Sequence, residues 1–391
     1  MFTRPTLLFL AMISTAGVVF SQQAGTVIGR RPGAAIGTRI TSTRVIPVPT
    51  CGPSSATGDA SPAVPEMIFS RMMGDLVCVR HSDGTIEQLH SEIPYGVLSP
   101  SGTDVAYWVV DKHELHVYSI ASHQDAIVDT APGAIMRDLV WSASGRRLSY
   151  FPAGANPPGI RSVNLDTGKR QIFPGHFVTI VPSPDPEHIV TVGLDSIVRT
   201  SIANGQQEIV AKAPYPTSAA FSGHGGLLGI LANAPVSALN APPQPANGTD
   251  AAASDDEPDC TGGAFFLIVQ NTRTKQVVDV RFPQGFDTVL DFSFSPDERT
   301  IAVTYGVVGC DYPGEKAQIY LVSLPELKLT ALSSAERMSV KPTWTPDGKT
   351  IVYEDYTGSD SPLLAVHLQT RKVTRLTSPG QFGPDTWLGW R

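Results

Sequence analysis

Short runs of apolar residues alternate with polar turn residues along most of the chain. Examples are residues 105–108, 148–151, 301–303 and 351–353, each bounded by Gly, Pro, Asp or Ser. Such runs are typical of β-strands joined by tight turns. No stretch beyond the first twenty or so residues shows the 3.6-residue period of an amphipathic helix. The pattern therefore predicts an all-β fold.

A short phrase recurs before many of these strands. It consists of an apolar or aromatic residue, Ser or Thr, often Pro and Asp, and then Gly or another polar residue. The best copies start at Phe294 and Trp344, good ones at Leu98 and Trp141, and degenerate ones at Pro182 and Phe221. Proline fixes φ at about −65° and suits the first central position of a turn. The phrase thus predicts a hairpin turn between the first two strands of a repeat.

This placement assigns structural roles to several conspicuous residues. Asp297 and Asp347 occupy the turn, where an Asp side chain caps backbone groups, so we expect them to be structural. Trp141 and Trp344 precede the turn, so we expect them to pack between neighbouring sheets.

The spacing of the hydroxyl residues sets the size of the repeat. It is 43 residues from Ser99 to Ser142, 41 to Ser183 and 39 to Ser222. It is then 73 to Ser295 and 50 to Thr345. A period of about 40–45 residues is that of a four-stranded propeller blade. The 73-residue interval holds only one further strand pair, which predicts an insert at about 233–263.

These phrases resemble the WD-like repeats of TolB-type β-propellers, over roughly residues 66–391. The resemblance implies a β-propeller. Counting the repeats, with the C-terminal strand completing the first partial blade, gives seven four-stranded blades, and six is the alternative. Residues 67–91 supply three strands without an inner one, and residues 386–390 look like an inner strand. We therefore expect residues 384–391 to pair with the strands of residues 66–91 and close the ring. TolB proteins carry an α/β domain before the propeller, whereas here residues 22–65 look like a flexible arm, so the TolB role in envelope integrity does not transfer directly.

The first 21 residues have the features of a signal peptide. Arg4 precedes an apolar stretch at 6–20, and small residues flank a cleavage point after Ser21. An uncleaved N-terminal anchor is the alternative. We expect a secreted or periplasmic protein with no membrane span after cleavage. The net charge of −7 argues against a nucleic-acid partner, and a monomer is expected.

Four cysteines, Cys51, Cys78, Cys260 and Cys310, fit an oxidising compartment. The repeat register places Cys260 and Cys310 in equivalent loops of neighbouring blades, which predicts a disulfide between them. Cys78 lies in the middle of a strand and is expected either to be a buried free thiol or to pair with Cys51 of the arm.

Catalytic motifs are not found in the sequence. It lacks Gly-x-Ser-x-Gly, His-Glu-x-x-His, a phosphate loop and Cys-x-x-Cys. His113, His116 and His123 could supply metal ligands, but solvated turn histidines are the simpler interpretation. We therefore assign no catalytic or metal-binding residue and expect no cofactor, although a structural calcium ion would be compatible with this prediction.

The connections between second and third strands are long at residues 152–159, 233–263, 306–316 and 355–361. All of them emerge on one face of a propeller, and function concentrates in such loops. We expect a binding face that includes Asp311, Tyr312, Asp355, Tyr356 and Asp360, with functionless variable loops as the alternative. The sequence thus favours an exported binding or scaffold module for a protein or envelope component. The alternative is a metal-dependent propeller lyase or hydrolase acting on a sugar or lactone.

Overall fold

The computed structural model of the chain describes residues 51, 65–71, 76–90, 93, 96–175, 177–233, 266–282, 288–307, 316–356, 361–377 and 385–390. All of them belong to one compact unit that spans Val48–Arg391. The predicted signal peptide, nearly all of the predicted arm and the predicted insert lie outside the described residues. Every regular element within the described ranges is a β-strand, as predicted. In these ranges no helix has the length and apolar character needed to cross a bilayer.

The described strands fall into seven antiparallel groups of four, numbered here along the chain. Group 1 contains β28 (Asp385–Trp390), β1 (Met67–Arg71), β2 (Leu76–Arg80) and β3 (Ile86–His90). Group 2 contains β4 (Gly96–Leu98), β5 (Asp104–Val109), β6 (Glu114–Ser119) and β7 (Gln124–Thr130). Group 3 contains β8 (Ile135–Trp141), β9 (Arg147–Ala153), β10 (Ile160–Asn164) and β11 (Arg170–Phe173). Group 4 contains β12 (Thr179–Val181), β13 (His188–Val192), β14 (Ser196–Ser201) and β15 (Gln207–Lys212).

The remaining three groups follow the same order. Group 5 contains β16 (Pro216–Phe221), β17 (Leu227–Ala232), β18 (Phe266–Asn271) and β19 (Val277–Val280). Group 6 contains β20 (Thr288–Phe294), β21 (Thr300–Val307), β22 (Lys316–Ser323) and β23 (Leu329–Ala331). Group 7 contains β24 (Met338–Trp344), β25 (Thr350–Tyr356), β26 (Leu363–His367) and β27 (Val373–Arg375). A single parallel bridge, Ala317 to Met338, links groups 6 and 7 into one sheet.

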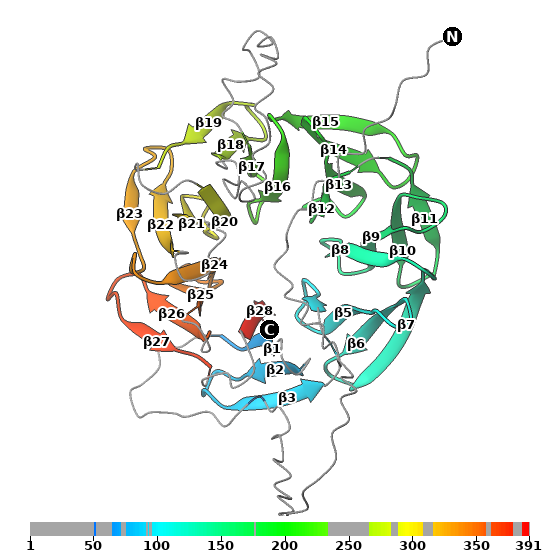
Figure 1. Cartoon of the computed structure of the whole chain (residues 1–391), viewed down its shortest axis with the longest axis horizontal. Coiled ribbons are helices and arrows are strands. Elements are labelled where there is room, and N and C mark those ends of the chain that lie inside the picture. Colours follow the sequence, from blue (N-terminus) through cyan, green and yellow to red (C-terminus); the bar gives the residue numbers. More distant parts are fainter. Residues whose placement is uncertain are drawn as a thin grey trace, which may run out of the picture. The chain divides into compact units, whose positions relative to one another are not determined.

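The groups are arranged side by side around a common centre (Figure 1). Within each group we call the strands a to d from the centre outward, so β28, β16 and β24 are a strands and β3, β19 and β27 are d strands. The C-terminal strand β28 pairs antiparallel with β1, from Met67–Trp390 to Arg71–Asp385. The predicted pairing between the two ends of the repeat region is therefore present.

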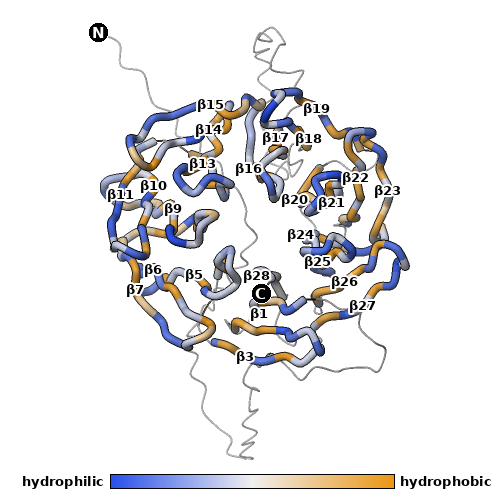
Figure 2. The backbone as a smooth tube through the Cα atoms, turned by 180° about the vertical axis from the view of Figure 1, so that it is seen from behind, coloured by the Kyte–Doolittle hydropathy of each residue, from blue (hydrophilic) through white to orange (hydrophobic). Residues whose placement is uncertain are grey.

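Strands are buried on both faces because alternate residues contact different neighbouring groups. In β5, Val105 and Tyr107 pack against group 1, whereas Ala106 and Trp108 pack against group 3. The period of two along a strand produces this division, and Figure 2 shows the resulting apolar stretches within strands and hydrophilic stretches at many turns.

Seven apolar clusters join the groups in succession. Representative pairs are Ile68–Tyr107 for groups 1 and 2, Trp108–Tyr150 for 2 and 3, Ile160–Ile189 for 3 and 4, Val190–Ile230 for 4 and 5, Leu231–Val303 for 5 and 6, Ile319–Tyr353 for 6 and 7, and Val352–Phe69 for 7 and 1. The last cluster packs the end of the chain's repeat region against its beginning.

The recurring phrase forms the a–b turn, as predicted, and the structure explains its hydroxyl residue. The side-chain oxygen of Ser99, Ser142, Ser222, Ser295 or Thr345 accepts a hydrogen bond from the backbone N–H five residues later, at 2.9–3.2 Å. Asp297 and Asp347 also accept hydrogen bonds within their own turns, so their predicted structural role is confirmed. The hydroxyl hydrogen bonds lower the pKa of both carboxyl groups.

Two faces of the molecule follow from the antiparallel order. The a–b and c–d turns share one face: Ile120 donates a backbone hydrogen bond to Thr103, and Leu165 to Arg146, with equivalents in groups 4 to 7. The b–c and d–a connections share the opposite face, where Ala131 donates to His113 and Ala213 to Asp195. We call these the a–b face and the b–c face.

A disulfide joins Cys51 to Cys78 of β2, with 6.0 Å between their Cα atoms. This is the second of the two states predicted for Cys78, so the buried free thiol is wrong. Both residues are buried in the cluster between groups 7 and 1. Cys260 and Cys310 lie outside the described residues, and their pairing stays a prediction.

Candidate functional site

Tryptophans of the recurring phrase tie neighbouring groups together. The indole N–H of Trp141 donates to the Val97 carbonyl oxygen of group 2 at 2.8 Å, and Trp344 donates to Ser293 of group 6 at 3.1 Å. Trp390, the corresponding residue of β28, donates to Trp344 at 2.8 Å. These aromatic residues are thus structural, as predicted for Trp141 and Trp344, because each fills the gap between two a strands.

Four groups have a smaller residue than tryptophan at this position of the phrase: Leu98, Pro182, Phe221 and Phe294. A pocket lies beside two of them. Group 4 has Pro182 at this position, and a pocket of only about 10 Å³ lies between groups 3 and 4. Group 5 has Phe221, and a pocket of about 250 Å³ lies between groups 4 and 5. We call the larger one the 4–5 pocket. It opens on the a–b face, since the turns at Pro184, Gly225 and Lys275 form its rim.

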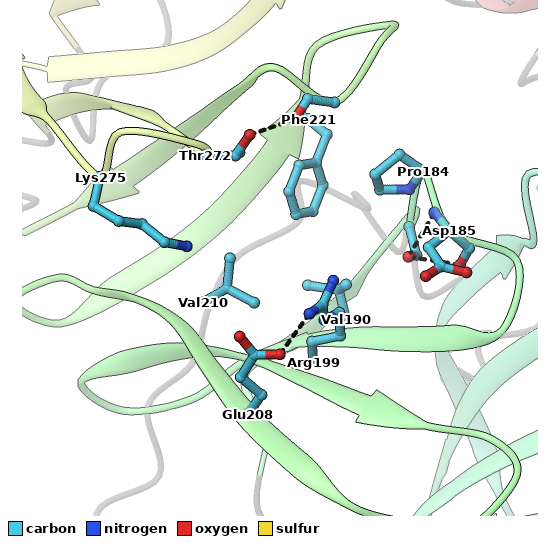
Figure 3. A pocket seen from close by; sticks show the side chains of 11 residues that line it. Pro184, Asp185, Val190, Arg199, Glu208, Val210, Phe221, Thr272 and Lys275 are labelled. Atoms are coloured by element: carbon cyan, nitrogen blue, oxygen red, sulfur yellow. Dashed lines mark hydrogen bonds and ion pairs between the residues drawn. The ribbon is translucent and has the colours of Figure 1, made fainter.

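The 4–5 pocket combines an apolar wall with charged side chains (Figure 3). Val190, Val210 and Phe221 provide the apolar part. Lys275 and Asp185 lie on opposite sides of the pocket in Figure 3, and Arg199 and Glu208 form an ion pair at 2.5 Å between them. A ligand entering here would meet both an apolar surface and fixed charges.

Both carboxylates of the pocket already have partners. Glu208 is paired with Arg199, whose hydrogen bond and charge lower the pKa of the carboxyl group. Asp185 accepts hydrogen bonds from the backbone N–H of Glu187 and the His188 ring, and these contacts hold its pKa below the ordinary value. Both groups are therefore ionised at neutral pH. Sequence analysis missed this pocket; its signal was the degenerate phrase at Pro182 and Phe221.

Two residues of the predicted binding face, Asp355 and Tyr356, are described by the structure, and both lie in β25. Because the strand extends to Tyr356, Asp355 belongs to a strand and does not open a loop. The Asp355 side chain is 1% exposed and forms an ion pair with Arg337. Tyr356 is partly exposed, and its hydroxyl donates to Glu354 at 2.9 Å. Asp311, Tyr312 and Asp360 lie outside the described residues, and a binding role for these five residues stays a prediction.

Charged residues of β20, β24 and β25 form a network beside Asp355. The buried Glu354 carboxylate pairs with Lys341 at 3.2 Å, and Asp291 lies close enough to feel the charges of both. Desolvation raises the pKa of Asp291 to about 6, although the Phe292 N–H and Lys341 oppose the shift. Asp291 is only partly exposed. A change between pH 4 and 7 should therefore alter the protonation of Asp291.

The raised pKa of Asp291 predicts a pH-dependent loss of stability. The unfolded chain releases this proton at about pH 3.9 and the folded chain at about pH 6, so folding is favoured below the first value and weakened as pH rises through the second. We expect Asp291→Asn to raise the free energy of unfolding at pH 7.5 by about 1–2 kcal/mol, after allowance for partial exposure, and to change it little at pH 4. Urea unfolding of both proteins across this range measures the difference. Parallel pH profiles would show that Asp291 is not the group responsible.

The three histidines considered as metal ligands do not converge. His113 contacts the Ala134 carbonyl oxygen, His116 lies between Glu114 and Asp125, and His123 contacts the Tyr118 hydroxyl. Across the described ranges no group of three or more His, Cys, Asp or Glu side chains is placed to hold a metal ion.

Large apolar side chains are exposed at the b–c face and on the outermost strands. Of the eight such residues among those described, Val110, Leu194 and Tyr215 lie in b–c or d–a connections, and Ile135 begins β8 at the same edge. Each of these four is more than half exposed. The other four, Ile127, Ile172, Ile209 and Val373, lie on the outermost strands. None of the eight lies on the a–b face.

Comparison with known proteins bears on the fold. No family model matches the chain, and no curated protein matches its sequence. Among solved structures, an oligogalacturonate lyase in complex with manganese is similar with a TM-score of 0.52 and 11% identity, over 80% of this chain and 84% of that one. The oligogalacturonate lyase of Vibrio parahaemolyticus gives 0.51 and 11%, over 81% and 80%.

The chain has a β-propeller fold. It is also similar to TolB from Acinetobacter baumannii, with a TM-score of 0.44 and 14% identity over 83% of this chain and 82% of that one. The propeller predicted from the recurring phrase is confirmed as a fold by the arrangement of the strands and by the similarity to the two lyase structures. At these identities the similarity concerns the fold of the propeller alone, and the lyase activity and the manganese belong to the other proteins.

Proposed function

We propose that this chain is an exported, seven-bladed, closed propeller that serves as a binding or scaffold module for a protein or envelope component. The observation that carries the proposal is the placement of Val110, Ile135, Leu194 and Tyr215, all exposed at the b–c face. Exposed aromatic and aliphatic side chains gathered on one face of a rigid scaffold are typical of protein-interaction surfaces. The long connections predicted from the sequence emerge on this same face.

Two further features support parts of the proposal. The pairing of β28 with β1, together with the apolar cluster between groups 7 and 1, supports seven blades in a closed ring. The Cys51–Cys78 disulfide fits an oxidising compartment and therefore a secreted or periplasmic location.

Substitutions on the b–c face should weaken partner capture without affecting folding. We expect the double variant Leu194→Asn, Tyr215→Asn to capture the partner from envelope extract at least about tenfold less well, as loss of an interface anchor would cause. Tyr215 has a φ of 50°, which Asn tolerates. Quantitative pull-down followed by mass spectrometry measures the captured partner.

The control removes two exposed apolar residues from the outermost strands. Ile172→Thr with Ile209→Thr changes two outer strands and should leave capture unchanged. If both double variants capture equally, the b–c face is not the binding surface. A loop exchange on this face should be confined to residues 357–360, because replacing Asp355 would leave the charge of Arg337 without its buried partner.

The enzyme alternative makes a different prediction about the purified chain. Metal analysis of the full-length protein should find no stoichiometric transition metal if it is a binding module. A bound manganese or zinc ion at one per chain would contradict our proposal and favour the lyase or hydrolase.

A further inference from the structure

The 4–5 pocket is lined by two cationic side chains that differ in accessibility. Arg199 is paired with Glu208, and its Nε is buried, so a ligand in the pocket cannot reach that atom. Lys275 is exposed and forms no salt bridge in the described part of the chain, although its charge helps to lower the pKa of the Glu208 carboxyl group. Its ammonium is therefore the cation of this pocket that can pair with a ligand anion.

The positions of the Asp185 and Glu208 carboxylates indicate how a charged ligand would be oriented in the pocket. Asp185 and Glu208 are satisfied by His188, Glu187 and Arg199, so they do not require a cation. Asp185 lies across the pocket from Lys275, with Phe221 and Val210 between them (Figure 3). An anionic group would therefore be held beside Lys275, away from Asp185, with the apolar part of the molecule over Phe221 and Val210.

The size of the pocket limits the ligand. A volume of about 250 Å³ is below that of pockets for drug-sized molecules, which begin at roughly 300 Å³. It suits a single ring or a short branched chain with one charged group. Its position on the a–b face separates it from the apolar b–c face of the proposed partner surface.

We propose that the 4–5 pocket binds a small carboxylate with an apolar body. Lys275 pairs with the carboxylate, and Phe221 with Val190 and Val210 contacts the apolar body. Phe221 occupies the position at which groups 1, 3 and 7 have tryptophans that donate a hydrogen bond to the preceding a strand.

The test compares two probes that differ in charge. Phenylacetate and the uncharged phenylacetamide are titrated into the full chain, and binding is followed by ligand-observed NMR. We expect phenylacetate to bind several-fold more tightly, about threefold to fivefold, because a partly exposed ion pair contributes this much. Equal affinity of the two probes would overturn the role of Lys275.

Two variants locate the site. Lys275→Gly removes the ammonium and keeps the turn, since Lys275 has a φ of 63° and the equivalent turns of groups 3 and 4 have Gly168 and Gly205. It should bind both probes equally weakly. Phe221→Trp should fill the pocket, abolish binding of both probes and leave the melting temperature equal or higher.

The control is Lys169→Met, which removes a lysine from the c–d turn of group 3, where Lys169 does not line the pocket. It should leave the affinity for phenylacetate unchanged. If Phe221→Trp folds and still binds phenylacetate as the parent does, the ligand lies elsewhere and the proposal fails, whatever the outcome for the b–c face.

Discussion

Deleting residues 384–391 should destabilise the whole propeller, not only its C-terminus. The deletion removes β28, which pairs with β1 at five positions. An antiparallel ladder has about one hydrogen bond per registered pair, so at roughly 1 kcal/mol for each bond the loss is about 5 kcal/mol. It also removes the hydrogen bond from Trp390 to Trp344, which joins groups 1 and 7. Thermal unfolding should show a melting temperature lower by about 10 °C or more.

A deletion at the other end of the chain provides the control. Removing residues 22–47 leaves the compact unit Val48–Arg391 intact and should not change the melting temperature. A smaller change, Trp390→Phe, removes only the indole donor and should cost about 1 kcal/mol. An unchanged melting temperature after the C-terminal deletion would count decisively against ring closure.

Removing the Cys51–Cys78 disulfide should produce the second-largest loss of stability. The bond closes a loop of 27 residues and lies within the cluster that joins groups 7 and 1. Loop entropy predicts a contribution of about 3–4 kcal/mol for this length. The double variant Cys51→Ala, Cys78→Ala avoids placing polar groups in a buried site. Its free energy of unfolding in urea should fall by that amount.

Reduction of the parent protein separates this bond from the predicted Cys260–Cys310 pair. A reductant should destabilise the parent at least as much as the double variant is destabilised, and any excess belongs to the second pair. Peptide mapping without reduction should yield a 51–78 linked peptide and a 260–310 linked peptide. Finding Cys260 and Cys310 free or paired elsewhere would contradict the blade register from which their pairing was predicted.

The sequence by itself determined the repeat and the order of its strands. The hydroxyl residues recur at intervals near 40, and the a–b turn depends on contacts between residues only a few positions apart, such as Ser99 with Asp104. Local interactions of this kind are readable from one sequence. The apolar pattern of residues 386–390 similarly predicted an inner strand, and β28 occupies that place beside β1.

Contacts between distant segments of the chain decided whether a polar side chain near the end of a strand is buried. Asp355 follows an apolar run and looks like the start of a loop, but its partner Arg337 precedes the adjacent strand and holds the carboxylate inside. The sequence left Cys78 either as a free thiol or bonded to Cys51, and only the approach of their Cα atoms to 6.0 Å decided between the two. The sequence around a carboxylate or a cysteine does not indicate which distant residue will form an ion pair or a disulfide with it.

The 4–5 pocket is likewise a property of the assembled ring. Its apolar wall comes from β13, β15 and β16, and Lys275 lies in a turn after β18. The sequence did show that Phe221 belongs to a degenerate phrase. A smaller side chain at this position leaves a pocket only where the neighbouring group does not fill the space between the two groups. Neighbouring groups meet through side chains about forty residues apart, so their fit depends on three-dimensional packing. The exposed apolar residues of the b–c face gain their significance in the same way, because only the antiparallel order of the strands brings them to a common face.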